Sequence, residues 1–196
     1  MKNFFFSLLL LLTIASLNAQ DKREGHYWDK NGVKRTGELK PVFGTIMYGT
    51  RIKFYQNDEK EGKWGKDVME SFVWGTDSFA LIHHFQVASV GSYSSDFAKV
   101  LEVGEIVLYK HFRKVRQSAG MPGQVYIPVA YTDYTYVVKA KGEEKYYGIF
   151  SKNQFKKYFL PLILKDMELT EKVLDMKKRE WLDHIPQFVR EFNAKY

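Results

Sequence analysis

The sequence predicts an α+β fold: an antiparallel β-sheet, or an open β-barrel, formed by the N-terminal strands, with two to three C-terminal α-helices packed on it. Between about residues 25 and 150, short runs rich in β-branched and aromatic residues alternate with turn sequences. From about residue 151 to residue 194, apolar residues recur at helical spacing instead. Because strands come first and helices last, the two kinds of element segregate within one domain.

The longest apolar-rich run after the N-terminus, residues 97–112, marks the centre of the expected sheet. It is dense in Val, Ile, Leu and aromatic residues, and a single glycine, Gly104, interrupts it. Two geometries remain open: a type II′ turn at Gly104-Glu105 that reverses the chain, or a bulge that bends one long strand. In both cases the segment is scaffold, without chemistry of its own.

Local signals predict the other strands. Asn31-Gly32 predicts a hairpin over residues 25–40, since both residues tolerate the positive φ of a type I′ turn, and Pro41 is expected to end its second strand. Further strands are expected at residues 50–56, 70–75, 78–87, 131–141 and 144–149. Three polar or glycine-containing segments are expected as loops or turns: residues 57–67, 91–96 and 113–128.

The C-terminal part predicts three helices. Ser151 is a natural N-cap for the first, and Pro161 is expected to kink that helix or to end it at about Leu160. The second is expected over about residues 168–179 and the third over about residues 181–194. The side chains expected to face inward are Phe155, Phe159, Leu162 and Ile163, then Leu169, Val173 and either Leu174 or Met176, and finally Phe188, Val189 and Phe192.

The first 19 residues predict a secretory signal peptide. Lys2 supplies a positive start, and the mostly apolar run of about 14 residues that follows is short of the ~20 that span a bilayer. We therefore expect cleavage after Ala19 and export to the periplasm, the outer-membrane periphery or the medium. No transmembrane segment is expected in the mature chain, and residues 20–196 are expected to form a single domain.

Composition excludes several classes of function. The chain has no cysteine, which excludes disulfides, cysteine-linked lipid anchors, thiolate zinc sites and cysteine nucleophiles. The formal net charge is +7, carried by lysines scattered along the chain. Nucleic acid is not an expected partner of an exported protein. Two interpretations of the charge stay open: a solubilising lysine-rich surface, or a surface whose partner is an anionic component of the cell envelope, such as a lipid headgroup or an acidic polysaccharide, or another envelope protein.

The sequence contains no recognisable catalytic or metal-binding constellation. The five histidines lack a ligand spacing such as HExxH, and His83 and His84 are expected to face opposite sides of a strand. The serines of residues 91–95 lack the strand-to-helix elbow of serine hydrolases, and no phosphate-binding loop is present. Glu102 and Glu105 flank a solvated turn without the apolar pocket that tunes glycosidase carboxylates. We therefore expect no catalytic residue, no metal and no cofactor.

The segment 113–128 with its neighbours is the candidate binding region. Cations beside aromatic rings can bind sugar acids, anionic headgroups or a peptide carboxylate. The alternative is a solvated loop whose arginines pair with nearby acidic residues. The candidate ligand-binding residues are Arg113, Lys114, Arg116, Tyr126 and Tyr131.

Short motifs are spread over most of the mature chain. They are a G…NG…G-x-L-K hairpin through Gly25, Gly32, Gly37, Leu39 and Lys40, a VLxxGxIxLY core through Gly104, Leu108 and Tyr109, and an N-x-F-K-K start at residues 153–157, followed by Leu169, Lys172-Val173 and Phe192-Asn193. In their order and spacing they resemble a family of uncharacterised secreted proteins from Bacteroidetes-type bacteria. The chain departs from that pattern at Phe192, where the family has tyrosine. The resemblance implies export and a strand-rich domain with C-terminal helices, and no activity, cofactor or catalytic residue.

Three hypotheses about function follow. The first is an exported, single-domain protein of the cell envelope that acts in binding or as an accessory component, without catalytic activity. The second is a hydrolase of envelope or extracellular polymers whose carboxylates or histidines come together only in the fold. The third is a peripheral membrane-surface protein. A pocket with two convergent titratable side chains of shifted pKa favours the enzyme, whereas a filled interior with an exposed aromatic patch favours binding.

Overall fold

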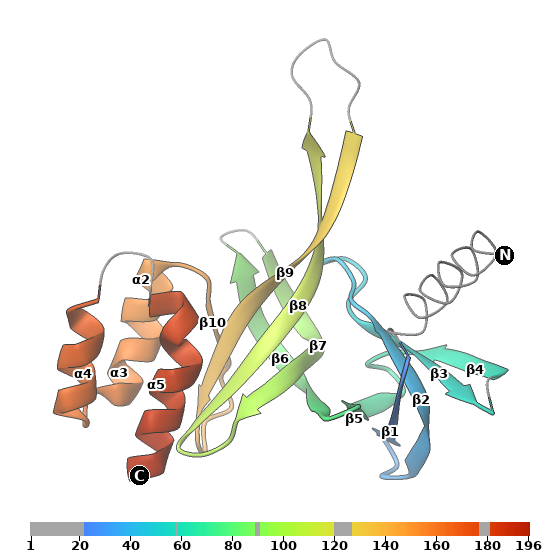
Figure 1. Cartoon of the computed structure of the whole chain (residues 1–196), viewed down its shortest axis with the longest axis horizontal. Helices are drawn as coiled ribbons and strands as arrows, with labels where there is room; N and C mark the ends of the chain where they lie inside the picture. Colours follow the sequence, from blue (N-terminus) through green and yellow to red (C-terminus); the bar gives the residue numbers. More distant parts are fainter. Residues whose placement is uncertain (1–21, 58, 89–90, 120–126, 177–180) are drawn as a thin grey trace, which may run out of the picture.

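The computed structural model describes residues 22–57, 59–88, 91–119, 127–176 and 181–196, without the side chains of 116–119 and 127–129. Within these residues, ten strands form one antiparallel sheet and the C-terminal helices pack on it, which confirms the expected α+β class (Figure 1). The sheet is open rather than closed into a barrel. The expected signal peptide lies outside the described residues.

The sheet joins two meanders. Its strand order is β10-β9-β8-β7-β6-β5-β1-β2-β3-β4, so β1 to β4 form one meander, and β5 returns to pair with β1 and begins the second. The strands are β1 (Arg23–Asp29), β2 (Lys34–Val42), β3 (Arg51–Gln56), β4 (Glu59–Trp64), β5 (Met69–Trp74), β6 (Asp77–Ala88), β7 (Gly91–Glu102), β8 (Ile106–Ala119), β9 (Ile127–Ala140) and β10 (Tyr147–Ile149). The helices are α2 (Lys152–Gln154), the π-helix η1 (Phe155–Phe159), α3 (Leu160–Ile163), α4 (Met167–Leu174) and α5 (Trp181–Lys195).

The three segments expected as loops or turns contain strands instead. The structure places β4 in residues 57–67, the start of β7 in residues 91–96, and the outer ends of β8 and β9 in residues 113–128. Their polar composition is compatible with a strand because a sheet edge, or a face in solvent, needs few apolar side chains. β8 and β9 remain paired as far as Ala119 opposite Ile127, and they rise from the rest of the sheet as a long hairpin (Figure 1).

The hairpin of β1 and β2 confirms the turn predicted at Asn31-Gly32, but with another geometry. Of these two residues only Gly32 has a positive φ, 76°. The Asp29 carboxylate accepts hydrogen bonds from the backbone N–H groups of Asn31 and Val33, both at 2.9 Å. This geometry is typical of a type I turn closed by a left-handed glycine rather than of a type I′ turn. Pro41 does not end β2, which pairs with β3 for one residue more.

The sheet curls around two apolar interiors. One, enclosed mainly by β1 to β5, contains Tyr27, Leu39, Ile52, Phe54, Met69, Phe72, Phe79 and Phe97. The other, enclosed by β6 to β9, contains Ile82, Phe85, Val87, Tyr93, Ala98, Tyr109 and Val137. Around this second interior the sheet turns back on itself: a Cβ atom on Gly148 of β10 would overlap the carbonyl oxygen of Gln86 in β6. The strand β4, at the other end, is a sheet edge.

The connection between β2 and β3 ties the two halves of the sheet together. The rings of Phe43, in the connection, and Phe112, in β8, lie 4.9 Å apart between centroids. The Gly44 carbonyl accepts a hydrogen bond of 2.8 Å from the backbone N–H of Lys114. Residues that follow β2 in the chain therefore lie against β8, which comes about seventy positions later in the chain.

The helices enclose a third interior against β8, β9 and β10. Ser151 caps the first helix as predicted, since its side-chain oxygen accepts the Gln154 N–H at 3.3 Å. The expectation that this helix ends at about Leu160 is wrong: it passes through the π-helical turn η1 and continues as α3. Pro161 lies in the first turn of α3, directly after the π-helical turn, which accommodates the proline inside a continuous helix.

The predicted apolar stripes of the helices are buried. The structure also decides between Leu174 and Met176, the two alternatives for the inner face of the second helix. Met176 packs against the interior, whereas Leu174 is exposed. The buried members of this third interior are Ile106, Leu108, Tyr136, Val138 and Ile149 from the sheet and Phe155, Phe159, Ile163, Leu169, Val173, Trp181, Ile185, Phe188, Val189 and Phe192 from the helices.

Gly104 lies in the turn between β7 and β8, which pair with each other as an antiparallel hairpin. Of the two geometries left open by the sequence, the reversing turn is therefore present and the bulge in one long strand is not. The φ of Gly104 is not positive, so the turn is not type II′ with Gly104 in its first central position. Glycine is required because a Cβ atom there would lie 2.5–2.8 Å from the side-chain amide of Asn193 in α5. That amide accepts the Ile106 N–H at 2.9 Å and donates to the Ile106 carbonyl at 2.8 Å. The C-terminal helix thus clamps the central turn of the sheet.

Replacement of Asn193 by alanine is expected to lower the free energy of unfolding by about 1–3 kcal/mol, because it removes two hydrogen bonds and leaves both Ile106 backbone groups unpaired. Urea denaturation followed by circular dichroism measures this loss. Gly104→Ala is also expected to destabilise, and the double variant should lose less than the sum of the single losses, since removing the amide frees the space for the methyl group. If the losses of unfolding free energy in the two single variants simply add in the double variant, Gly104 and Asn193 do not interact and the proposed contact is wrong.

Candidate functional site

The structure separates the two cations that begin the candidate binding region. The Arg113 guanidinium binds the Asp133 carboxylate across the hairpin, with Nη2 at 2.7 Å and Nε at 3.2 Å from Oδ2. Lys114, the next residue of β8, lies on the opposite face of the strand. Its side chain has no ion-pair partner among the described residues. Arg113 is therefore engaged, and Lys114 is available to a ligand.

The structure describes the other three candidate residues only in part. Arg116 pairs with Ala130 through the backbone of the β8–β9 hairpin. Tyr131 lies opposite Val115 in the same hairpin and is 46% exposed. Tyr126 lies outside the described residues. The predicted cluster of cations and aromatic rings therefore stays a prediction, with Lys114 the described member that is free of an ion pair and Tyr131 an exposed one.

Lys114 instead lines a hollow of about 440 Å³ with residues from the other half of the sheet. Arg51 of β3, Lys63 of β4 and Tyr48 of the β2–β3 connection line it too, and no acidic residue does. None of the three cations has an ion-pair or side-chain hydrogen-bond partner in the part of the chain that the structure describes. We call these four residues the basic hollow.

A row of lysines crosses the strands beside the basic hollow. The register places Lys53 of β3 between Lys40 of β2 and Lys63 of β4. Arg51, two residues before Lys53, shares its face of the strand. Like charges directly opposite one another destabilise a sheet, so this concentration of positive charge opposes folding. Such an arrangement is typical of a surface that binds an anion.

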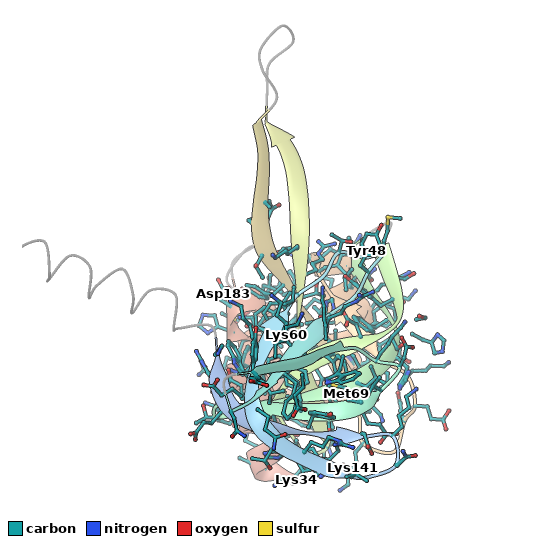
Figure 2. The ribbon with its side chains drawn as sticks, turned by 90° about the vertical axis from the view of Figure 1, so that its right-hand side faces the viewer. Lys34, Tyr48, Lys60, Met69, Lys141 and Asp183 are labelled. Atoms are coloured by element: carbon teal, nitrogen blue, oxygen red, sulfur yellow. The ribbon has the colours of Figure 1, made fainter. Side chains whose placement is uncertain are left out.

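Tyr48 belongs to a single turn that holds apolar side chains in solvent. The Thr45 carbonyl accepts the N–H groups of Tyr48 at 3.1 Å and Gly49 at 3.0 Å, and Gly49 closes the turn with a φ of 59°. The three residues after Thr45, which we call the apolar tip, are exposed: Ile46 (42%), Met47 (82%) and Tyr48 (69%). Figure 2 shows Tyr48 at the edge of the molecule from which the β8–β9 hairpin rises.

A buried carboxylate fixes the position of this turn. Asp96 of β7 accepts hydrogen bonds from the backbone N–H of Thr50 at 2.7 Å and from its hydroxyl at 3.2 Å, directly after the turn. The same carboxylate accepts the Phe97 N–H at 2.9 Å and pairs with Nε2 of His111 in β8, also at 2.9 Å. Asp96, Thr50 and His111 are all buried. The network therefore joins the start of β3, and with it Arg51, to β7 and β8.

The Asp96–His111 pair is not arranged for nucleophilic catalysis. The other ring nitrogen of His111, Nδ1, is buried and has no hydrogen-bond partner among the described residues, so no nucleophile lies within its reach. The Tyr93 ring lies 4.6 Å from the His111 ring, between centroids. Burial raises the pKa of the Tyr93 hydroxyl, and the Asp96 charge adds to the effect, so this phenol stays neutral.

A second hollow, of about 380 Å³, lies on the other side of the apolar tip. Lys66, Ser92, Ser94 and Ser95 are among the residues that line it. Lys66 Nζ donates to the Ser94 hydroxyl at 3.3 Å, in an exposed position. A lysine that activates a serine must be desolvated, which this lysine is not. The serines lie on β7 and not on a strand-to-helix elbow, so this hollow is a polar depression without a nucleophile.

The expectation that His83 and His84 face opposite sides of their strand is wrong. His84 has a φ of 48°, which interrupts the alternation, so that both histidines are exposed between the buried Ile82 and Phe85. Their ring centroids are 6.5 Å apart. Across the described ranges, no three His, Asp or Glu side chains gather closely enough to hold a metal ion.

The two glutamates at the β7–β8 turn are held in ion pairs. Glu102 Oε1 lies 2.6 Å from Nη2 of Arg190, and Glu105 Oε1 lies 2.8 Å from Nζ of Lys141. The hydrogen bond from Lys141 lowers the pKa of Glu105, which is the wrong direction for a general acid. These carboxylates stabilise surface contacts and do not form a glycosidase pair.

Comparison with known proteins adds no precedent for this site: no family model, no curated protein and no solved structure matches the chain. The resemblance to a secreted family therefore stays a prediction. In the described part of the chain, none of the helices combines the length and the apolar character needed to cross a membrane.

Sequence analysis missed Arg51, Lys63 and the apolar tip. Lys63 falls in the loop expected over residues 57–67, and Arg51 falls in the strand expected over residues 50–56. One signal was visible: residues 44–49 place Ile, Met and Tyr together between two glycines, in a segment with no predicted element. Three consecutive apolar residues outside a strand or helix are unusual on a soluble surface.

Proposed function

We propose that the protein is exported to the cell envelope and acts there, without catalysis, as a binding or accessory component that recognises an anionic group through the basic hollow. The observation that carries this proposal is the meeting of Arg51, Lys63 and Lys114 in one hollow that no acidic residue lines. Guanidinium and ammonium groups beside an aromatic ring bind phosphate, sulfate and carboxylate. Export rests on the signal-peptide pattern of residues 1–19.

The arrangement of the titratable groups supports binding over hydrolysis. The Asp96 carboxylate is occupied by hydrogen bonds that hold the fold, and Glu102 and Glu105 are occupied by ion pairs. An exposed tyrosine beside unpaired cations is what a recognition surface needs. Hydrolysis of an envelope polymer remains the alternative, and it predicts turnover that the substitutions below would abolish.

The proposal is tested by titrating the mature chain with inositol hexakisphosphate, a soluble multivalent phosphate, while NMR follows the backbone amides. We expect the largest chemical-shift changes at the backbone amides of Arg51, Lys63 and Lys114 and of their neighbours. The triple variant Arg51→Gln/Lys63→Gln/Lys114→Gln should bind at least about tenfold more weakly, because each unpaired cation contributes roughly fivefold to the affinity for an anionic surface.

The matched control removes the same charge elsewhere. Lys145, Lys152 and Lys156 are exposed and lie outside the basic hollow, near the helices. The variant Lys145→Gln/Lys152→Gln/Lys156→Gln should keep most of the affinity. Equal losses in the two triple variants would show a response to net charge alone, and the site would be rejected.

A further inference from the structure

We propose that the anionic group is the headgroup layer of a phospholipid membrane, and that the apolar tip inserts below it while the basic hollow binds the headgroups. This inference rests on the proposed function, because it names the partner of the same site. It goes beyond that function by assigning a role to Ile46 and Met47, which do not line the basic hollow.

Backbone hydrogen bonds fix the conformation of the apolar tip and keep its side chains exposed. Two hydrogen bonds to the Thr45 carbonyl close the turn, and the Asp96 network fixes the residue after it. Met47 and Tyr48 therefore stay in water, whereas Ile46 is exposed on one side and touches Gly91 of β7 on the other. Met47 is 82% exposed, more than any other large apolar side chain that the structure describes. An exposed apolar cluster on a fixed turn marks an interaction site.

The charge around the apolar tip matches one kind of partner. Lys63 and Lys114 line the basic hollow beside it, Lys66 lines the second hollow, and Arg51 lines both. An anionic bilayer presents negative charge at its surface and hydrocarbon a few ångströms below. An apolar point ringed by cations is complementary to both layers. Asp67 is the acidic residue exposed beside Lys66, and it leaves the cations in excess.

A protein partner fits these observations less well. A stable protein interface buries about 800 Å² on each side and has an apolar centre with few charges. Here three apolar side chains stand near Arg51, Lys63 and Lys114, which have no ion-pair partner among the described residues. Headgroups can move to meet each cation, whereas a folded partner would need a fixed acid for every one.

Sedimentation with lipid vesicles tests the inference. The mature chain is mixed with vesicles of equal parts phosphatidylglycerol and phosphatidylcholine, or with phosphatidylcholine alone. At low ionic strength we expect binding to the anionic vesicles only, and progressive release as salt screens the charges. The variant Met47→Ser should partition at least about tenfold more weakly, because it loses the apolar side chain that inserts, while its hexakisphosphate affinity changes less than twofold. Tyr48 is left unchanged because it also lines the basic hollow. Ile46 is left unchanged because it packs against Gly91.

The matched control is Met167→Ser, a methionine of similar exposure, 67%, at the start of α4. It should sediment as the wild type does, and all variants should keep the wild-type unfolding midpoint. If hexakisphosphate binds but anionic vesicles do not, or if Met47→Ser partitions normally, the membrane inference is overturned and the proposed function stands. If neither probe binds, or charge removal at the basic hollow affects neither, both are overturned.

Discussion

Replacement of Asp96 by alanine is expected to lower the free energy of unfolding by about 3–5 kcal/mol, because it breaks a buried hydrogen-bond network and leaves several donors unpaired. The substitution leaves His111 Nε2, the Phe97 N–H and both Thr50 donors without their acceptor, in a place that water does not reach. Each orphaned donor adds a desolvation penalty. Urea denaturation followed by tryptophan fluorescence measures the loss.

Two further variants separate the roles of this carboxylate. Asp67→Ala removes an exposed acid of the neighbouring hollow and should change stability by less than about 0.5 kcal/mol. Thr50→Val keeps the backbone bond to Asp96 and loses only the hydroxyl, for an expected loss of about 1 kcal/mol. Because Thr50 adjoins both the turn and Arg51, Asp96→Ala should also weaken vesicle binding under conditions where it remains folded. A stability equal to that of Asp67→Ala would show that the network is dispensable.

The fold class was predictable because it depends on local patterns. Alternating apolar residues in Ile52 and Phe54, and helical spacing in Phe188, Val189 and Phe192, report which face of an element is buried. The errors in the predicted secondary structure lie in segments whose side chains are buried on one side only or not at all. β4, with the sequence EKEGKW, is an edge strand whose charges protect it from pairing with another chain, and the same charges made it resemble a loop.

The buried polar network could not be predicted, for a different reason. A polar residue such as Asp96, in the sequence GSYSSD, carries no local sign that it is buried. Its burial depends on Thr50 and His111, which come from other strands and supply the missing hydrogen bonds. The same holds for the basic hollow. Lys114 was selected from its neighbours in sequence, but its actual neighbours, Arg51 and Lys63, are brought to it by the curl of the sheet.

The short sequence motifs contain residues that make structural contacts rather than residues of the candidate site. Gly104 and Asn193 belong to two short motifs almost ninety positions apart, and the structure places the amide of one against the backbone of the other. Glycine and asparagine are each needed there for one contact, which explains why both appear in a pattern that implies no activity. These motifs describe the scaffold, and the apolar tip and basic hollow lie outside them.

Replacement of Gly148 by alanine is expected to destabilise the protein by about 3 kcal/mol or more, at the upper end of the range for overpacking. The added methyl group would overlap the carbonyl oxygen of Gln86, a backbone atom that no side-chain rotation can move aside. β10 also cannot easily move away from β6 to relieve this overlap. Its next residue, Ile149, is fully buried against the helices, and Ser151 caps α2 immediately afterwards. The strain must therefore open the curl between β6 and β10.

Gly65→Ala is the matched control for this substitution, because a Cβ atom there would meet its nearest neighbours at 3.9–4.0 Å, an ordinary contact distance, and its φ is not positive. It should change the free energy of unfolding by less than about 0.5 kcal/mol. Hydrogen exchange locates the damage: in Gly148→Ala, amides of β6, β9 and β10 should lose protection before those of β1 to β4, because the two interiors are separate. Uniform loss of protection across the sheet would instead show that the two halves unfold as one unit, joined by the β2–β3 connection and the Asp96 network.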